Sequence, residues 1–385
     1  MFLDINDIFT QKKQRKRLRK SILFVIFASS IETKATSDYP SLRIMKKRRT
    51  SLKDLAEQLG VSIATVSRAL RNSHEVGDEM KQKVQELAKK LNYRPNPFAQ
   101  GLRSEAPKMI GVVLPNLVTH FNASVLDGIE DYATKEGYSV ISANSHEDHT
   151  REEQAVDNFV SMHVEGIIAC LAQDTVEYKH FEAIHEIGIP LVFFARTCMQ
   201  DQFSSVTGNG DIAAQEATQH LIDTGSRRIA FLGGPNHLDM VQRRKHGYLE
   251  ALRENKIGID RFLVVSGKMD FTEAREATLR LLDREDRPDA ILAVNDTVTF
   301  AAFDAIKERQ LRIPEDVAII GFTESDSSAF VTPKLSVIMD QAHQLGEKAC
   351  ELLLRKINGD NRIYREIVPM KLKIRESSDK RTDNL

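Results

Sequence analysis

The residues with the clearest chemical meaning lie on a short segment, IATVSRAL, that begins at Ile63. At helical spacing, its outward face combines methyl-bearing side chains, hydroxyls and one guanidinium, from Ile63, Ala64, Thr65, Ser67 and Arg68. Such a face can enter a DNA major groove, where methyl groups contact thymine and polar groups hydrogen-bond base edges and phosphates. The segment therefore indicates double-stranded DNA as a partner. The alternative is an ordinary helical bundle with a solvated polar face.

A second set of polar and aromatic side chains comes directly after a series of short apolar runs. The set comprises Asn116, His120, Phe121, Asn144, Ser145, Arg196, Asn209, Asn295 and Asp296, with Arg244 on a helix that follows one run. In open α/β sheets, residues at the carboxyl ends of strands line the ligand crevice. This mixture of groups favours a sugar or a similar polar metabolite. Simpler roles remain open, since Asp296 could cap a helix, Arg244 could pair with a surface acid and Phe121 could belong to the core.

The chain shows no pattern typical of an enzyme. Its sequence contains no glycine-rich nucleotide loop after a strand, no nucleophile elbow and no cluster with metal-ligand spacing. Cys170, Cys198 and Cys350 are expected to be small buried thiols in a reducing cytosol. His146 and His149 fall in an acidic, exposed-looking loop that suggests no catalytic pairing. We therefore expect no catalytic residue, no metal and no cofactor.

The elements that would position the DNA-facing segment form a helix-turn-helix head within residues 45–93. Ser51 and Asp54 resemble a capping box, and Gly60 supplies the left-handed residue that ends a first helix. Ser62 would cap the second helix. Apolar residues at helical spacing give each of three helices a buried face: Leu52, Leu55, Ala56 and Leu59, then Val66, Ala69 and Leu70, then Met80, Val84, Leu87, Ala88 and Leu91 after a start at Asp78.

Residues 94–106 contain a second DNA-directed signal, a hinge helix and linker. Asn96 followed by proline is a strong helix start, but the helix can run only about two turns and contains Gly101. Isolated helices shorter than about 12–15 residues are marginal in water, so this one should form only when something packs on it. Leu102 would then be placed to wedge into the minor groove and bend the duplex, although it could also be a plain linker residue.

From Met109 onward, short apolar runs alternate with amphipathic stretches. The runs cover residues 109–115, 138–143, 166–172, 190–195, 228–234, 289–294 and 317–322. This alternation predicts repeated βα units with buried parallel strands. The region is long for one open sheet.

The segments LKDLAEQLGVSIATVSRAL and LNYRPNPFAQGLR resemble the head and hinge of the lactose-repressor (LacI/GalR) family of bacterial transcription regulators. The likeness extends from residue 50 to about 376. It implies that Ile63, Ala64 and Arg68 read operator bases, with thymine-methyl and shape readout prominent because two of the three cannot form bidentate hydrogen bonds. It also implies that phosphates are contacted by Ser62, Thr65, Ser67 and Asn72, and that Tyr93 and Asn96 support contact with the DNA backbone. Leu102 from each half of a dimer would wedge into the central base step.

The resemblance further implies an α/β body of two lobes, like periplasmic binding proteins, with parallel Rossmann-like sheets over residues 107–376. The preceding head would be an all-α helix-turn-helix DNA-binding domain. Lobe 1 is expected to cover about 107–205 and 338–365. Lobe 2 would cover about 206–337 with the C-terminal strand, leaving 377–385 as a tail.

Arg244 and Asp296 match the arginine and aspartate that clamp effector hydroxyls in the family. Three positions depart from the family's pattern: Ala195 precedes Arg196 in place of aspartate, Asn209 replaces an aspartate, and Asp340 stands where glutamine is common. The implied effector-binding set is therefore Asn116, Phe121, Ser145, Arg196, Asn209, Arg244, Asp296 and Asp340. The chain also has no tryptophan to stack on a sugar. These departures indicate a cleft that differs from those of other family members, so the resemblance does not identify the ligand.

Charge is distributed unevenly, although the net charge is only −1. Residues 45–106 hold thirteen Lys/Arg against seven Asp/Glu, and residues 107–385 hold thirty-two against forty-four. A basic head on an acidic body suits contact with a polyanion at one end.

Residues 1–44 contain a basic run followed by the apolar segment SILFVIFASSI, which is the order found in a secretory signal. We expect them to be translated upstream sequence before a start at Met45, the alternative being a disordered basic arm.

Together these patterns predict a cytoplasmic, homodimeric regulator, most simply a repressor, that binds a palindromic operator and responds to a sugar or related metabolite. No apolar run approaches the roughly 18–20 residues of a membrane span. No heptad-rich tail follows Ile374 to form a tetramer.

The alternative function is that of an exported sugar-binding protein, which would share the two-lobe body and use the signal-like stretch. Residues 50–103 oppose it, because an exported receptor has no use for a DNA-reading head.

Overall fold

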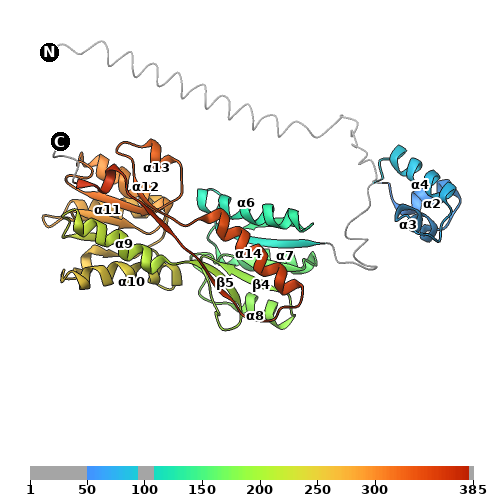
Figure 1. Ribbon diagram of the computed structural model, residues 1–385, viewed down its shortest axis with the longest axis horizontal. Coiled ribbons are helices and arrows are strands. Elements are labelled where there is room, and N and C mark those ends of the chain that lie inside the picture. Colours follow the sequence, from blue (N-terminus) through green and yellow to red (C-terminus); the bar gives the residue numbers. More distant parts are fainter. Residues whose placement is uncertain (1–49, 94–107, 381–385) are drawn as a thin grey trace, which may run out of the picture. The chain divides into compact units, whose positions relative to one another are not determined.

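The computed structural model describes residues 50–93 and 108–380 (Figure 1). The first range is a helical head and the second is a larger α/β body, and they belong to separate compact units. The expected hinge, with its residues Asn96 and Leu102, lies outside the described residues, as does the segment 1–44.

The head consists of α2 (Leu52–Leu59), α3 (Ile63–Leu70) and α4 (Asp78–Lys90). The predicted capping box is confirmed, since the Ser51 N–H donates to the Asp54 carboxylate at 2.7 Å and the Asp54 N–H donates to Ser51 Oγ at 3.3 Å. Gly60 ends α2 with a φ of 65°, a left-handed conformation that glycine adopts without a steric penalty. The turn between α2 and α3 is therefore fixed by local sequence.

A small apolar core holds the three head helices together. Its buried members are Leu55, Ala56, Val66, Ala69, Val76, Val84 and Ala88. These residues recur at helical spacing, so each helix buries one face and leaves the other to solvent. The predicted inward faces of the head are confirmed.

Lobe 1 of the body is a sheet with strand order β11-β5-β4-β3-β1-β2, in which every pairing is parallel. Its strands are β1 (Met109–Leu114), β2 (Ser139–Asn144), β3 (Gly166–Ala169), β4 (Leu191–Phe194), β5 (Ser204–Gly208) and β11 (Arg365–Val368). One face packs against α6 (His120–Lys135) and α14 (Ala342–Ile357), and the other against α7 (His149–Ser161) and α8 (Lys179–Glu186). The parallel strands are buried because helices cover both faces.

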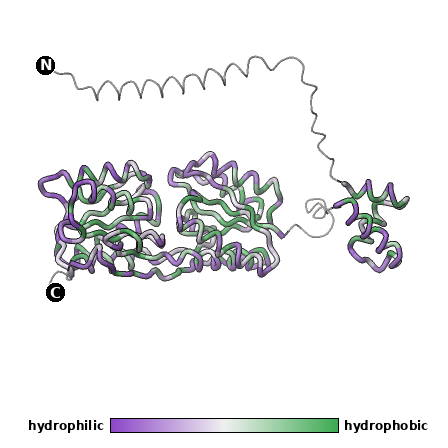
Figure 2. Tube along the Cα trace, turned by 90° about the horizontal axis from the view of Figure 1, so that it is seen from above, coloured by the Kyte–Doolittle hydropathy of each residue, from purple (hydrophilic) through white to green (hydrophobic). Residues whose placement is uncertain are grey.

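Lobe 2 repeats this plan, with strand order β12-β10-β9-β8-β6-β7 and only the β10–β12 pairing antiparallel among its described strands. Its strands are β6 (Ile229–Leu232), β7 (Val264–Val265), β8 (Ala290–Ala293), β9 (Ala318–Phe322), β10 (Ser336–Met339) and β12 (Lys371–Lys373). Its helices are α9 (Gly210–Asp223), α10 (Asp239–Glu254), α11 (Phe271–Leu282), α12 (Asp296–Glu308) and the short α13 (Ser327–Phe330). Figure 2 shows the apolar strands inside each lobe and the more polar helices around them. All seven apolar runs form strands, as predicted.

The chain passes between the lobes after β5, after β10 and after β11. Because β5 extends to Gly208 and β10 to Met339, the first two passages come later than the expected boundaries at 205 and 337. The third follows Val368 and not residue 365. Strand pairing sets these limits, and hydropathy alone does not reveal where pairing stops.

The expected tail at 377–385 is wrong for its first residues. Ser377 and Ser378 are fully buried, and Ser377 Oγ donates to the Ile319 carbonyl at 2.7 Å. Lys380 Nζ reaches Ser226 Oγ and the Asp289 carbonyl at 3.1 and 3.2 Å. The body therefore continues to at least residue 380, because short polar side chains satisfy backbone groups at the end of lobe 2.

Close helix packing positions a residue that matters for the site. At Gly247 a Cβ would lie 1.9 Å from the Asp211 carbonyl oxygen, so α9 and α10 approach closer there than any larger residue allows. Arg244 lies one turn earlier on α10, and its Cγ is 3.2 Å from where a Cβ of Gly210 would lie. The close approach brings the Arg244 stem against the start of α9.

The longest helices in the described part of the chain, α6, α10 and α14, have 16 residues each. Each spans about 24 Å at 1.5 Å per residue, against a hydrocarbon core of about 30 Å. None of the described helices combines the length and the apolar character needed to cross a bilayer.

Candidate DNA-binding face and effector cleft

The outward face of α3 is exposed, as the sequence predicted. Ile63, Ala64 and Arg68 are open to solvent, and Ile63 exposes 45% of its surface although its side chain is apolar. Val66 and Ala69, on the opposite face, are fully buried. The exposed methyl groups are therefore available to contact apolar groups such as those of thymine.

Hydroxyl groups on α3 are held in place by bonds within the head. Ser62 Oγ accepts the Thr65 N–H at 3.1 Å and lies 2.9 Å from Thr65 Oγ1. Ser67 Oγ accepts from the Arg71 guanidinium at 3.4 Å. A hydroxyl can accept and donate at once, so Ser67 is fixed and can still donate to a phosphate oxygen.

Arg68 is not free in this head, a feature that the sequence did not reveal. Its Nε lies 2.9 Å from an Oε of Glu75, in the turn between α3 and α4, and both side chains are about half exposed. An exposed ion pair of this kind contributes little stability. A DNA base or phosphate that binds Arg68 must therefore displace a carboxylate that is weakly bound.

Asn72 and Tyr93 frame the same helix-turn-helix unit. Asn72 is exposed just after α3, with a φ of 58° and its N–H bonded to the Ala69 carbonyl. The Tyr93 ring packs against the head core, and its partial burial raises the pKa of its hydroxyl. Asn96 and Leu102 lie outside the described residues, so their expected roles stay predictions.

The body contains a small, partly open pocket lined by residues of both lobes. Its lining comprises Ala195, Thr207, Gly208, Leu345, Gly210, Asp239, Met240, Arg243, Arg244, Asp340 and Met370. Arg244 and Asp340 are the two predicted effector residues in this lining. The others in the predicted set lie outside it, so their contacts are described one by one.

Arg244 is the buried centre of the cleft. Its guanidinium donates to Asp340 Oδ1 at 2.7 Å and to the Val294 carbonyl, and it lies 3.8 Å from the centre of the Phe322 ring. Its Nε is shielded from solvent and has no hydrogen-bond partner among the described residues. Burial lowers the pKa of Arg244 and raises the pKa of Asp340, while their mutual attraction opposes both shifts. The open alternative that Arg244 pairs with a surface acid is wrong, because its acid is buried.

Asp296 does not cap the helix it begins. The cap is Asn295, whose side-chain oxygen accepts the Val298 N–H at 2.9 Å. Both Asp296 carboxylate oxygens are shielded from solvent without a hydrogen-bond partner within normal bonding distance in the described structure. Burial raises the pKa of Asp296; Thr323 opposes the shift, and the charge of Asp340 adds to it. The Thr323 hydroxyl and the Phe121 N–H lie nearby without bonding at normal distance, so this carboxylate can accept hydrogen bonds from a ligand.

Arg196 is committed to lobe 1 and does not reach the pocket with a free guanidinium. Its Nη1 and Nη2 donate to the Glu147 carboxylate at 2.6 and 3.1 Å, and Nη1 also donates to the Leu171 carbonyl at 3.0 Å. Although burial opposes it, the Glu147 charge holds the pKa of Arg196 above its usual value. Arg196 therefore braces the loops after β2, β3 and β4.

Four further candidates have local partners. Ser145 is fully buried and directs its hydroxyl at the Leu114 carbonyl, and the Asn116 side chain accepts the Val118 N–H at 2.7 Å. The Asn209 side chain accepts the Met370 N–H at 2.7 Å. Phe121 is partly buried and packs against the lobe 1 core, so it serves in part as a core residue, which was the alternative left open by the sequence. The structure gives these residues supporting contacts at the strand ends.

Sequence reasoning missed two acidic residues near the cleft: Asp239 lines the pocket, and the charge of Glu324 interacts with that of Asp340. Glu324 accepts the backbone N–H groups of Gln341 and Ala342 in the passage after β10, and burial raises its pKa. Asp239 contributes to the pocket from the first turn of α10. Glu324 follows the carboxyl end of β9, so the rule that ligand residues come after strand ends could have found it.

Direct hydrogen bonds join the lobes beside the cleft. The Asp239 carboxylate in lobe 2 accepts from Gln200 Nε2 at 3.2 Å and from Thr197 Oγ1 at 3.5 Å in lobe 1. The Met269 N–H donates to Gln173 Oε1 at 3.0 Å. These bonds are partly buried and few in number among the described residues, so relative motion of the lobes breaks few direct bonds.

Comparison with known families gives two matches. Residues 51–96 match the bacterial regulatory proteins of the lacI family, and residues 218–378 match the periplasmic binding protein-like domain. The first match covers α2, α3 and α4, and the second covers most of lobe 2. Both agree with the domain types seen in the structure.

Known relatives match this chain over nearly the whole of their own length. Catabolite control protein A of Priestia megaterium is 32% identical over 332 residues, which is 84% of this chain and 98% of that protein. The ribose operon repressor of Bacillus subtilis strain 168 is 33% identical over 304 residues, which is 79% of this chain and 90% of the relative. These relatives are regulators and not enzymes, and they give no support to an exported receptor.

Solved structures show the same architecture. The lac repressor dimer bound to operator and the anti-inducer ONPF has a TM-score of 0.74 at 25% identity, covering 86% of this chain and 99% of that one. The regulator CelR in complex with cellobiose has a TM-score of 0.66 at 26% identity, covering 86% and 100%. The chain therefore belongs to the lacI family of bacterial regulatory proteins and is a DNA-binding transcriptional regulator.

Proposed function

We propose that this chain is a cytoplasmic homodimeric repressor that binds a palindromic operator and whose DNA affinity is set by a neutral sugar or related polyol in the cleft. The exposed face of α3 supports the DNA contact. The relatives named as operon repressors, and the similar lac repressor dimer bound to operator, support the assembly.

The observation that carries the effector assignment is the pair of buried polar groups without partners. The Asp296 carboxylate can accept hydrogen bonds and Arg244 Nε can donate one. A buried polar group without a partner costs about 1–3 kcal/mol. A ligand with neighbouring hydroxyls satisfies both groups, because each hydroxyl donates and accepts.

Charge in the cleft favours a neutral ligand. Asp340 already balances the Arg244 guanidinium at 2.7 Å. Asp296 and Glu324 lie close enough for their charges to interact with Asp340. An anionic effector would add charge to this acidic surrounding, whereas a sugar hydroxyl brings none.

The geometry of the lobes supports coupling to DNA. Effector candidates lie on both lobes, and the lobes are joined by few direct hydrogen bonds and by the strand passages. A ligand that binds one lobe arrangement better shifts the balance between arrangements. We expect a coupling free energy of about 1–3 kcal/mol between the effector and operator sites.

A thermal-shift panel tests the effector assignment on the full chain. Ribose, cellobiose and other neutral sugars are compared with sugar phosphates and free purines. A neutral sugar at about 100 times its Kd should stabilise by about 2.7 kcal/mol and raise Tm by several degrees, since it binds only the folded protein. Stabilisation by the anionic sugars or the purines alone would contradict the neutral-polyol assignment and leave the DNA-binding role intact.

Arg68→Ala tests the DNA face. Duplexes selected from a random library should contain inverted repeats, and Arg68→Ala should weaken their binding roughly tenfold to hundredfold by removing the guanidinium of α3. Glu75→Gln should strengthen binding and steepen its salt dependence, because it removes the carboxylate that competes for Arg68. Lys83→Gln, on exposed α4, is the control. Equal binding by all three variants would show that α3 does not read this DNA.

A further inference from the structure

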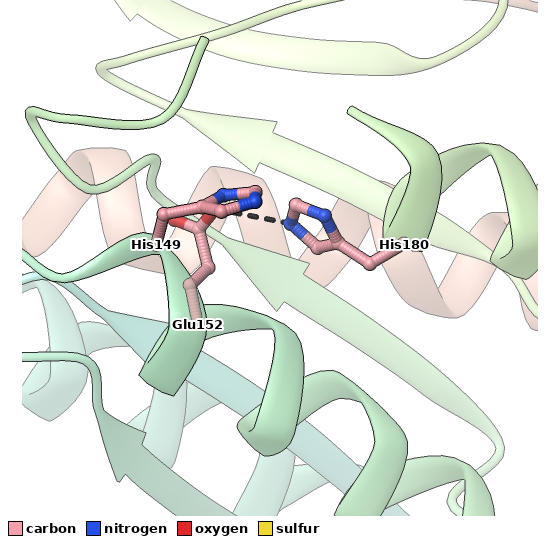
Figure 3. A group of neighbouring side chains, drawn as sticks. All are labelled: His149, Glu152 and His180. Atoms are coloured by element: carbon pink, nitrogen blue, oxygen red, sulfur yellow. Dashed lines mark hydrogen bonds and ion pairs between the residues drawn. The ribbon is translucent and has the colours of Figure 1, made fainter. Parts of the chain in front are cut away.

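Two histidines and a glutamate gather inside lobe 1, at residues that the effector site does not use. His149 and Glu152 lie on the first turn of α7, and His180 lies at the start of α8 (Figure 3). One ligand atom from each lies within 4.8 Å of the other two. Residues three apart on a helix share a face, so α7 presents His149 and Glu152 together toward His180.

Glu152 is a buried carboxylate with an unusual set of partners. It is completely shielded from solvent, and it accepts the Ala172 N–H at 2.6 Å and the Thr175 hydroxyl at 2.8 Å. Its Oε1 lies 3.0 Å from His180 Nε2. The nearby Arg196 guanidinium donates its hydrogen bonds to Glu147 and Leu171 instead. Buried charges in proteins are paired or coordinate metals, so this carboxylate requires a positive partner.

His149 has an unused ring nitrogen at the same place. Its Nδ1 is shielded from solvent and has no hydrogen-bond partner among the described residues. Its ring stands 5.2 Å from the His180 ring at an interplanar angle of 69°. Figure 3 shows both rings converging on the Glu152 carboxylate from different helices. An unprotonated ring nitrogen in this position can donate its lone pair to a cation.

We infer that His149, Glu152 and His180 form a binding site for a divalent transition-metal ion of the zinc class. Two imidazole nitrogens and one carboxylate oxygen are the ligands of an open three-residue zinc site, with the fourth position left to water. In a tetrahedral site with bonds of about 2.0–2.1 Å, ligand atoms are about 3.3 Å apart. The 3.0 Å separation of the Glu152 and His180 atoms is close to that value, and the His149 ligand atom lies within 4.8 Å of both.

The surroundings of Glu152 support this role. Metal-binding carboxylates are usually oriented by a second set of hydrogen bonds, and Ala172 and Thr175 supply two here. The segment that carries them also contains Gln173, which accepts the Met269 N–H of lobe 2. A bound ion therefore ties α7 and α8 to a segment that contacts the other lobe.

No pattern in the sequence predicted this cluster. His180 comes 28 positions after Glu152, on a separate helix, so no local metal motif exists. The expectation of no metal rested on the absence of such a motif. The fold brings the three residues together because α7 and α8 pack on the same face of the lobe 1 sheet.

Metal titration of the chelator-stripped full chain tests the site. Zn²⁺ should bind with one ion per chain at this site and raise Tm, as measured by calorimetry and thermal melts without effector or DNA. Co²⁺ in the same protein should give the visible absorption of a four-coordinate ion. His149→Gln should weaken Zn²⁺ binding at least about tenfold and remove the Tm increase. Its fold without metal should be intact, since His149 Nδ1 makes no hydrogen bond to any described residue.

His146→Asn is the matched control. It removes an exposed histidine from the same loop, and asparagine tolerates the left-handed φ of 55° found there. This variant should bind Zn²⁺ like the parent protein. If His149→Gln fails to fold, Thr175→Val provides the second test, because it removes an orienting bond to Glu152 and should also weaken binding. Failure of the folded parent to bind Zn²⁺ or Co²⁺, or equal binding by His149→Gln, would show only a buried, hydrogen-bonded Glu152–His180 pair. Neither result would bear on the effector proposal.

Discussion

Asp340→Ala should lower the free energy of unfolding of the body by about 3–5 kcal/mol, because it leaves the Arg244 guanidinium buried without its carboxylate partner. The two side chains are almost completely buried and are joined at 2.7 Å. Taking two charges out of water is costly, and the cost is offset only while both are present. Urea unfolding followed by circular dichroism measures the loss.

Two comparisons separate this effect from simple loss of volume. The double variant Arg244→Met with Asp340→Leu should recover most of the stability, because no buried charge is left unpaired. Glu276→Ala breaks an exposed pair with Arg280 on α11 and should shift the midpoint only slightly. An Asp340→Ala midpoint equal to that of Glu276→Ala would mean that the Arg244–Asp340 pair is hydrated in solution.

Asp296→Asn should weaken binding of the effector roughly tenfold to hundredfold and at the same time stabilise the free protein at neutral pH. Hydrogen bonds to a charged group contribute about 1.5–3 kcal/mol, and the variant loses the charge that strengthens them. The free protein gains about 1–2 kcal/mol because a buried carboxylate without a partner is replaced by a neutral amide. Operator affinity without effector should be unchanged.

The stabilisation of the free protein by Asp296→Asn should depend on pH. Burial raises the folded-state pKa of Asp296 above the usual value of 3.8, so between the two values the folded state binds more protons than the unfolded state. Stability contributed by the protonated group is therefore lost as pH rises through that window and stays reduced above it. The difference between variant and parent should be small near pH 3 and largest above the raised pKa. A variant less stable than the parent at pH 7 would contradict the view that Asp296 lacks a partner.

The local structure of the head could be predicted because its signals are short-range. Ser51, Asp54 and Gly60 define α2 through bonds within a few residues, and the apolar spacing defines the buried faces. The buried strands of the body were equally visible, since parallel strands covered on both faces consist of uninterrupted apolar runs. Edge strands such as β7 and β12 are short and partly exposed, so their composition gives little signal.

The candidate cleft was predicted by residue type but not by pairing. The rule for strand ends and the resemblance pointed to Arg244 and Asp296, and both have buried polar groups without partners. Arg196 was chosen on the same grounds, yet Glu147 occupies its guanidinium. Residue type indicates which groups can bind a polyol, whereas only the packed structure shows which of them are already satisfied.

Local sequence patterns were enough to predict the helix-turn-helix head, the alternating α/β body and the family, because hydrophobic periodicity, capping and turn residues act over a few positions. The contacts between distant groups could be seen only in the folded chain. Examples are Arg244 with Asp340, 96 positions apart, Asn209 with the Met370 N–H, 161 apart, and His180 with Glu152. Such pairs depend on how the sheets order their strands and where the chain changes lobes. No local pattern records that order, so the charge balance of the cleft and the histidine cluster became visible only in the folded chain.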